Sequence, residues 1–437
     1  MKTGLLRREE LWATLRIGAP AMVARAMIPF MFTVDMVALG RIDGAEIGVY
    51  GLGVAPMLFI QFLVIGAVQP VIFMGAQALG ANDTRLSGNI VRFAVRLVLL
   101  AAPVVIAIGF TLLPVFRFFG YPSELVRGAA AAGLVFSLGV PAIVLFLIGS
   151  YFLESLGRPQ IAPLTLGFGI ALNFFLNAPV IQMTTSFFNA PAAGAVLATV
   201  SVRWLLASAI WAYIWLRIDR AKLGLSGKID APKQLAARIW RAAGPTSTSY
   251  ALEHGLGMAM VFIAGTFSAA ALAGFQIAIN FSALAGMAMV GMGVAASVRI
   301  GQAVGQGDEN AARRAFASAL TLGFPLAAPI AAITFCSPEV IANLFLAGSE
   351  SIDSALISLR TISVYLITNG AYMISISANR AASNVRQSLR IVVLANVCVS
   401  TPMALMFAFI LNFGVTGLVY GMICGSIVGA ALSGFSF

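Results

Sequence analysis

Charged residues are scarce in this chain. Asp, Glu, Lys and Arg make up only 10% of its 437 residues, and 60% of the residues are hydrophobic, whereas an ordinary soluble domain is about 25% charged. So few charges cannot cover the surface of a protein of this size in water, which excludes a soluble globular fold. Because each helical crossing of a membrane takes about 20 to 25 residues, the length suits one integral membrane domain with short connections.

Metal ligands and phosphate-binding loops are missing as well. The chain has a single histidine, His254, and its three cysteines are set apart in apolar stretches, so we expect no metal site and no disulfide framework. The GxxxxGK[ST] loop of ATP-driven pumps is not present; the nearest stretch, residues 223–229, lacks its first glycine and its final Ser or Thr. Without metal ligands or a nucleophile beside a base, we predict neither an enzyme nor a cofactor.

The basic residues mark a membrane face. The net charge is +11, but the lysines and arginines do not gather in one patch, so no nucleic-acid partner is expected. Most of them flank the apolar runs on the side that holds the amino terminus, and Arg380 is counted among them. The positive-inside rule therefore predicts that both termini are cytoplasmic. Glu154 and Arg158 are expected to form a structural pair at the same face.

Apolar runs separated by charged or Pro/Gly-rich breaks predict twelve membrane-spanning helices. The runs exceed twenty residues and are apolar all round, unlike the short alternating segments of a membrane β-barrel. The fold class is therefore an all-α integral membrane protein. The predicted spans, numbered in chain order, are 11–40, 46–75, 89–116, 125–150, 160–182, 190–216, 238–265, 271–299, 311–335, 355–378, 389–411 and 414–437.

An internal repeat divides the chain into two halves of six spans. The stretch GAQALGAND at residues 75–83 is matched by IGQAVGQGD at residues 300–308. Because an even number of crossings separates the copies, the halves are predicted to be parallel repeats, which is a frequent plan of transporters. The predicted domains are an amino-terminal lobe (1–216), a basic cytoplasmic linker (217–237) and a carboxy-terminal lobe (238–437).

Laid out in this way, the chain resembles the multidrug and toxic compound extrusion (MATE) family of the MOP superfamily, and its NorM-like bacterial members. The matching residues are Pro20 followed by Asp35 in span 1, Asn173 in span 5, Glu253 in span 7 and Tyr365 in span 10. The Gly-Asp turns of the repeat add to the resemblance. It implies a two-lobe bundle with a V-shaped central cavity, and antiport of amphipathic organic cations against protons or sodium ions.

Asp35 is the first candidate for coupling ion movement to transport. It lies in an apolar stretch of span 1, where an ionised carboxylate is costly unless it is paired, hydrated or protonated. The resemblance places it opposite Asn173 and Asn177, which share a helix face because they are four residues apart. Many relatives carry an aspartate where this chain has Asn177, so we expect one titrating carboxylate in this lobe. The alternative is a structural aspartate bonded to polar neighbours.

By resemblance, Glu253 lines the carboxy-terminal lobe as a cation-binding or substrate-binding acid. Asp35 and Glu253 are expected to be the only acids deep in the membrane. Gln276, Tyr365 and Asn369 match positions that contact substrate or ion in relatives, and Asn369 stands where those relatives carry an aspartate. The lost charge weakens a sodium site. Proton coupling is therefore the prediction, and sodium coupling is the alternative.

Two further groups of residues could adapt the cavity to its cargo. Pro20 and Pro29 each remove a backbone hydrogen bond from span 1 and are expected to let it kink near Asp35, although proline is also frequent in membrane helices. Five methionines are candidates for a soft wall against varied apolar substrates, and the alternative is ordinary packing. They are Met258 and Met260 of span 7 and Met287, Met289 and Met292 of span 8.

The predicted function is alternating-access efflux of small organic cations in exchange for protons, by a monomer in the lipid bilayer of the bacterial inner membrane. A lipid or lipid-linked oligosaccharide flippase of the same superfamily is the alternative. Such flippases need arginines in the cavity for their anionic cargo, whereas Asp35 and Glu253 favour cations by Coulomb attraction. Arg25 or Arg203 facing the cavity would favour the flippase.

Overall fold

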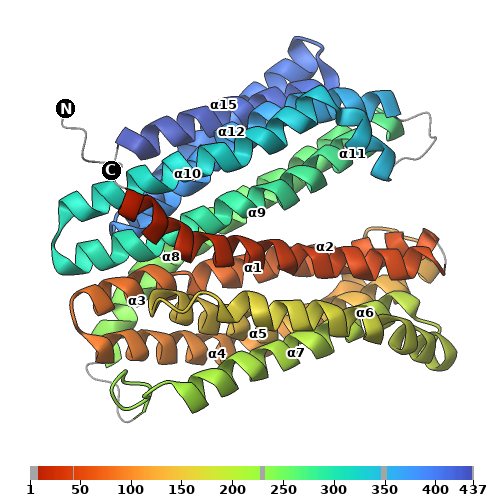
Figure 1. Ribbon diagram of the computed structural model, residues 1–437. Helices are drawn as coiled ribbons and strands as arrows, with labels where there is room; N and C mark the ends of the chain where they lie inside the picture. The colour runs from red at the N-terminus through yellow and green to blue at the C-terminus, as the bar shows by residue number, and fades with distance from the viewer. Residues whose placement is uncertain (1–7, 43, 227–231, 346–351, 436–437) are drawn as a thin grey trace. The chain divides into compact units, whose positions relative to one another are not determined.

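The computed structural model describes residues 8–42, 44–226, 232–345 and 352–435. These residues form helices joined by short turns, with no β-strand among them (Figure 1). Ten helical segments are long and apolar enough to cross a membrane. Two more helices complete the twelve predicted spans and are less apolar, because they carry more polar and charged side chains. They are α8 (Pro232–Gly265) and α12 (Ile352–Ala381).

The chain divides into two compact units. The amino-terminal unit is Met27–Ala243, and the carboxy-terminal unit is Met1–Ala26 together with Gly244–Phe437. One boundary falls inside α1 (Arg8–Gly40) and the other inside α8. The first part of each of these helices therefore groups with the other half of the chain. Of the predicted linker, residues 227–231 lie outside the described residues.

The amino-terminal unit is built around α5, which packs against α2, α4 and α7, while α6 packs on α7. The predicted second span is divided between two helices, because Pro70 begins a new helix after Gln69. The start of the linker is fixed to this unit, since the Thr84 hydroxyl donates to the carbonyl of Lys222 at 2.9 Å. The helices are α2 (Gly44–Val68), α3 (Pro70–Gly80), α4 (Thr84–Phe118), α5 (Ser123–Ser155), α6 (Ile161–Phe188) and α7 (Pro191–Arg217).

The carboxy-terminal unit is built in the same way around α12, which packs against α9, α10 and α15 (Figure 1). The bounds of its other helices are α9 (Ala269–Gln306), α10 (Glu309–Cys336), α11 (Pro338–Phe345), α13 (Val385–Val392), η1 (Val393–Ser400), α14 (Thr401–Leu405), η2 (Met406–Ile410) and α15 (Gly414–Phe435). In both units a single long helix thus has neighbours on several sides.

The eleventh predicted span is not a plain α-helix, because η1 and η2 are π-helical. Pro402 lies between them and has no backbone N–H to donate, while Thr401 donates its hydroxyl to the carbonyl of Asn396 at 2.8 Å. The backbone therefore widens on either side of the proline. Helix α15 packs closely on this segment through Gly421, where a Cβ atom would overlap the backbone of Ala404.

The repeated Gly-Asp motif forms the same turn in each half of the chain. Asn82 and Gly307 adopt left-handed φ angles of 59° and 75°. The aspartate that follows each of them, Asp83 or Asp308, then caps the next helix by accepting a hydrogen bond from the backbone N–H three residues on, at 2.9 and 2.8 Å. At this turn the predicted internal repeat is seen in the structure.

An ionic cluster fastens the start of α1 to the rest of the carboxy-terminal unit. Glu10 forms ion pairs with Arg299 of α9 and with Arg314 of α10, whose Nε lies 3.0 Å from Glu10 Oε1. One turn later, the hydroxyls of Thr14 and Ser318 lie 2.7 Å apart, and Arg299 donates to both. These contacts explain why the first part of α1 groups with helices from the second half of the sequence.

Candidate functional site

Asp35 lies at the centre of a polar cluster inside the amino-terminal unit. It is fully buried, and its carboxylate accepts hydrogen bonds from three other helices. Asn177 Nδ2 of α6 donates to Oδ1 at 3.0 Å, and the Tyr50 hydroxyl of α2 donates to Oδ2 at 3.2 Å. Thr199 Oγ1 of α7 lies 2.8 and 2.7 Å from the two oxygens. These donors are uncharged, and within the described ranges Asp35 forms no ion pair.

The two predicted asparagines face Asp35 from one side of α6, and both are buried. Asn173 Nδ2 donates to Thr199 Oγ1 at 2.8 Å and lies 3.4 Å from Asp35 Oδ1. Asn177 Nδ2 lies 3.3 Å from Asn173 Oδ1 in addition to its contact with the carboxylate. Because both amides turn an NH2 group toward Asp35, the cluster is arranged to stabilise a negative charge.

Sequence reasoning missed two partners of Asp35, namely Thr199 and Tyr50. Each is a buried polar side chain in an otherwise apolar span. The signal that could have found them is the one that singled out Asp35, since a polar side chain inside a membrane protein needs a hydrogen-bond partner. The roles predicted for Asp35, Asn173 and Asn177 in ion coupling stay predictions.

A buried arginine lies one helical turn from this cluster. Arg203 follows Thr199 by four residues on α7 and is 2% exposed. Its guanidinium donates to Gln61 Oε1 at 3.2 Å and lies over the rings of Phe136 and Phe32, 4.6 and 5.4 Å from their centroids. Two aromatic faces and an amide oxygen therefore stabilise this positive charge inside the unit.

The acid predicted in the carboxy-terminal half has a charged partner. Arg380 Nη2 of α12 donates to Glu253 Oε1 of α8 at 3.4 Å, and the two side chains are 4% and 11% exposed. Tyr250, almost one turn before Glu253, places its ring centroid 5.5 Å from the guanidinium carbon. This corrects the expectation that Arg380 is a flanking surface charge. The residue is buried because α12 continues to Ala381 at the centre of the unit.

Glu154 is a further buried acid, while the expectation that Asp35 and Glu253 alone lie deep in the membrane stays a prediction. It lies in the last turn of α5 and accepts a hydrogen bond from Ser150 at 2.8 Å. Arg158, its predicted partner, follows the end of the helix and donates to the hydroxyl of a tyrosine on α7 at 3.3 Å.

Glu154 and Arg380 occupy equivalent positions in the repeat. Helices α5 and α12 end in the same turn, in which Gly157 and Ser383 have φ angles of 75° and 70°. The N–H of Gly157 donates to the carbonyl of Glu154 at 3.1 Å, and the N–H of Ser383 donates to the carbonyl of Arg380 at 3.2 Å. Aligning these helix ends in the sequence would have shown that each central helix carries a charge at this point.

Of the residues predicted to contact substrate in the carboxy-terminal half, Tyr365 and Asn369 are partly buried and Gln276 of α9 is exposed. Tyr365 of α12 packs against an apolar cluster that includes residues of α9, and Asn369 follows it by one turn. Within the described ranges none of the three hydrogen-bonds Glu253, and their binding roles stay predictions.

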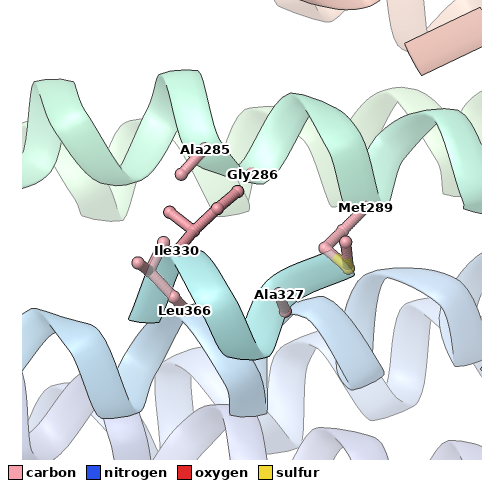
Figure 2. Close-up of a pocket in the computed structure, with 6 residues that line it drawn as sticks. All are labelled: Ala285, Gly286, Met289, Ala327, Ile330 and Leu366. Atoms are coloured by element: carbon pink, nitrogen blue, oxygen red, sulfur yellow. The ribbon is translucent and has the colours of Figure 1, made fainter. Parts of the chain in front are cut away.

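Two of the methionines predicted as a soft wall, Met258 and Met287, are partly buried on α8 and α9. Figure 2 shows an apolar pocket between α9, α10 and α12 that neither of them lines. Met289, another methionine of the predicted wall, contributes its side chain there. The lining residues are Ala285, Gly286, Met289, Ala327, Ile330 and Leu366.

Pro20 and Pro29 leave α1 as one continuous helix from Arg8 to Gly40. The boundary between the two compact units falls between these prolines, after Ala26. The predicted kink of span 1 stays a prediction.

Comparisons with known proteins agree over almost the whole chain. The sequence profile of the MatE family matches residues 20–178 and 245–406. The chain is 27% identical over 433 residues to "Multidrug resistance protein NorM" of Burkholderia vietnamiensis, which covers 97% of this chain and 93% of that protein. It is 28% identical over 455 residues to "Probable multidrug resistance protein NorM" of Bradyrhizobium diazoefficiens, with 97% and 92% covered.

Solved structures share the fold. The crystal structure of the eukaryotic MATE transporter AtDTX14 matches with a TM-score of 0.88 and 15% identity, covering 98% of this chain and 95% of that one. An outward-facing MATE family transporter of the MOP superfamily matches with a TM-score of 0.87 and 22% identity, covering 100% and 97%. The all-α, twelve-span architecture predicted from the sequence is confirmed by these matches.

Proposed function

The chain belongs to the MatE family of membrane transporters, and from this premise we propose that it is a secondary antiporter that exports amphipathic organic cations in exchange for protons. The observation that carries the proposal is the Asp35 cluster, a buried carboxylate bonded by neutral donors. The names of the relatives, which describe multidrug resistance proteins, support the class of cargo. We place the transporter in the bacterial inner membrane.

Asp35 can lose its negative charge in two ways, by taking up a proton or by contact with a cationic substrate. Its neutral donors stabilise the ionised form but leave the charge in place, and in a medium of low dielectric constant that charge attracts cations. Arg203 is engaged by Gln61 and two aromatic rings, so it leaves the carboxylate oxygens to other partners. Because proton and cation neutralise the same group, binding of one disfavours binding of the other.

This competition produces antiport when it is combined with alternating access. The ionised form of Asp35 holds the organic cation, and a proton arriving from outside the cell releases it. Each ligand shifts the conformational equilibrium by its different affinity for the two states. The proton then leaves toward the cytoplasm, and the cycle repeats.

Protons suit the Asp35 cluster better than sodium ions do. A bound sodium ion needs several oxygen ligands, but Asn173 and Asn177 turn NH2 groups toward the carboxylate. In the other half of the chain Glu253 is paired with Arg380, and Asn369 brings no negative charge. These observations support proton coupling.

The flippase alternative is not favoured. An anionic lipid headgroup needs arginines that are free to receive it, whereas Arg25 and Arg203 are both buried. Arg203 would have to leave Gln61 and its aromatic neighbours before it could bind such a group.

The test is transport of a fluorescent organic cation by proteoliposomes under an imposed pH gradient. The wild-type protein should exchange the cation with a steep pH dependence, and Asp35→Asn should lose exchange because the amide can neither ionise nor take up a proton. Glu9→Gln is the matched control, since Glu9 is an exposed acid on the same helix, and it should behave like the wild type. Exchange by Asp35→Asn with unchanged pH dependence would exclude the proposed coupling.

A second arm replaces the pH gradient with a sodium gradient across the same liposomes. We expect no cation exchange above the passive leak. Exchange driven by sodium alone would reject protons as the coupling ion and would leave the efflux function standing.

A further inference from the structure

The buried ion pair of the carboxy-terminal unit bears on which ions this transporter can bind. We propose that Arg380 is the resident counter-cation of Glu253 and excludes sodium ions from it, so that the carboxy-terminal unit binds no coupling ion. The inference rests on the proposed function, in which protons couple at Asp35. It adds the residue that decides the ion specificity of the second acid.

The contact itself is the first support. Arg380 Nη2 lies 3.4 Å from Glu253 Oε1, and both side chains are almost entirely buried between α8 and α12. A guanidinium stays charged under all conditions that a protein meets. The place that an incoming cation would take beside Glu253 is therefore already held by a fixed positive charge.

The surroundings of the pair are the second support. The ring of Tyr250 lies over the guanidinium, and Leu252 and Met373 pack into the neighbouring apolar cluster of Tyr372 and Ile376. In the described part of the chain there is no group of three or more His, Cys, Asp or Glu side chains that could hold a metal ion. A sodium ion at Glu253 would thus lose the arginine without gaining such a group of ligands.

The repeat provides the third support. The position equivalent to Arg380 in the amino-terminal unit is Glu154, at the end of a helix that closes with the same backbone turn. The turn therefore does not require an arginine. The positive charge is specific to the unit in which Glu253 needs a partner.

These observations give Arg380 a defined effect on cation binding. For sodium to bind Glu253, the ion pair must open and leave a guanidinium buried without its counter-charge, which is strongly unfavourable. Removing the charge at position 380 leaves the carboxylate available to an external cation. The variant should therefore gain a sodium site that the wild-type protein lacks.

The experiment measures sodium binding by the purified full-length transporter, with no transport step. Melting temperatures are recorded in sodium chloride and in choline chloride at equal ionic strength, because a ligand that binds the native state raises the melting temperature. The wild-type protein and Arg380→Lys should melt at the same temperature in both salts. Arg380→Gln should melt about 2 to 4 °C higher in sodium, and Glu253→Gln/Arg380→Gln should lose that gain.

Two results would overturn the proposal. One is a sodium-specific shift in the wild-type protein that Glu253→Gln removes. The other is a folded Arg380→Gln variant with the same melting temperature in both salts. If Arg380→Gln does not fold, the test uses Arg380→Lys and the wild-type protein. A higher melting temperature of Arg380→Lys in sodium chloride than in choline chloride would then contradict the proposal that a positive charge at position 380 excludes sodium. Because no transport is measured, failure here is distinct from failure of proton-driven efflux.

Discussion

In the amino-terminal unit, Asp35 receives hydrogen bonds from uncharged side chains on three helices. In the carboxy-terminal unit, Glu253 meets the guanidinium of Arg380 directly. Each unit also contains a buried arginine, but Arg203 lies over two aromatic rings, one turn along the helix from the cluster. The units thus contain the same kinds of charge in different arrangements.

The proposed exchange needs an acid whose charge a proton or a cation can neutralise. A guanidinium that is always present neutralises its carboxylate before any ligand arrives, so a proton or a cation binds that carboxylate only weakly. A carboxylate with neutral donors stays attractive to both. Under the proposed function, this contrast places the exchange at Asp35 and leaves Glu253 a structural role.

The largest effect is expected from removing one member of the buried ion pair. Arg380→Met leaves Glu253 without its counter-charge in the interior of the unit, which costs about 3–5 kcal/mol. The double variant Glu253→Gln/Arg380→Met should recover most of that loss, because neither charge is then unpaired. Thermal unfolding of the single and double variants in detergent gives the coupling energy.

The stability of Asp35→Asn is compared with that of Arg380→Met in the same thermal unfolding experiment. An amide at position 35 keeps neutral partners within reach, so it should cost far less stability than Arg380→Met while it abolishes exchange. If Asp35→Asn and Arg380→Met lowered the free energy of unfolding equally, neutral donors at Asp35 and a guanidinium at Glu253 would contribute the same stability. That result would contradict the contrast between the two units.

A smaller effect is expected at Thr199, whose hydroxyl lies within 2.8 Å of both oxygens of Asp35. Thr199→Val keeps the shape but removes a hydrogen bond to a charged group, which is worth about 1.5–3 kcal/mol. Thr199→Ser should restore the bond. The loss should be larger at high pH, where the carboxylate is ionised, than at low pH, and unfolding measured across that range checks the sign.

Thr165→Val is the matched control. Its hydroxyl donates to the backbone carbonyl of Ile161 at 2.6 Å, within α6, and among the described residues it bonds no acid. Its cost should be small and independent of pH. A pH-independent loss in Thr199→Val as well would mean that the hydroxyl does not stabilise the ionised carboxylate.

Much of this arrangement could be read from the sequence, and the failures have a common cause. Hydropathy located the spans, and an acid in an apolar run identified Asp35, because both are properties of one segment. The burial of Arg380 could not be read in this way. It depends on contact with Glu253, 127 positions away, and a charge near the end of an apolar run looks the same in sequence whether packing covers it or not.

The same reasoning explains the partial success at the amino-terminal cluster. Asn173 and Asn177 were placed opposite Asp35 by the family resemblance, and their spacing puts them on one helix face. Thr199 and Tyr50 come from helices whose faces are set by packing around α5, which no single segment encodes.

The smallest effect is expected at Tyr50, whose hydroxyl donates to Asp35 Oδ2 at 3.2 Å. This bond is longer than the contacts of Thr199, so Tyr50→Phe should cost about 1 kcal/mol, again more at high pH than at low pH. Tyr372→Phe is the counterpart in the carboxy-terminal unit, where the tyrosine hydroxyl accepts from Asn396 at 3.3 Å. The stability lost in Tyr372→Phe should not depend on pH, because Glu253 keeps the guanidinium of Arg380 as its partner. If instead Tyr372→Phe showed the pH-dependent loss and Tyr50→Phe did not, the titrating carboxylate would belong to the carboxy-terminal unit.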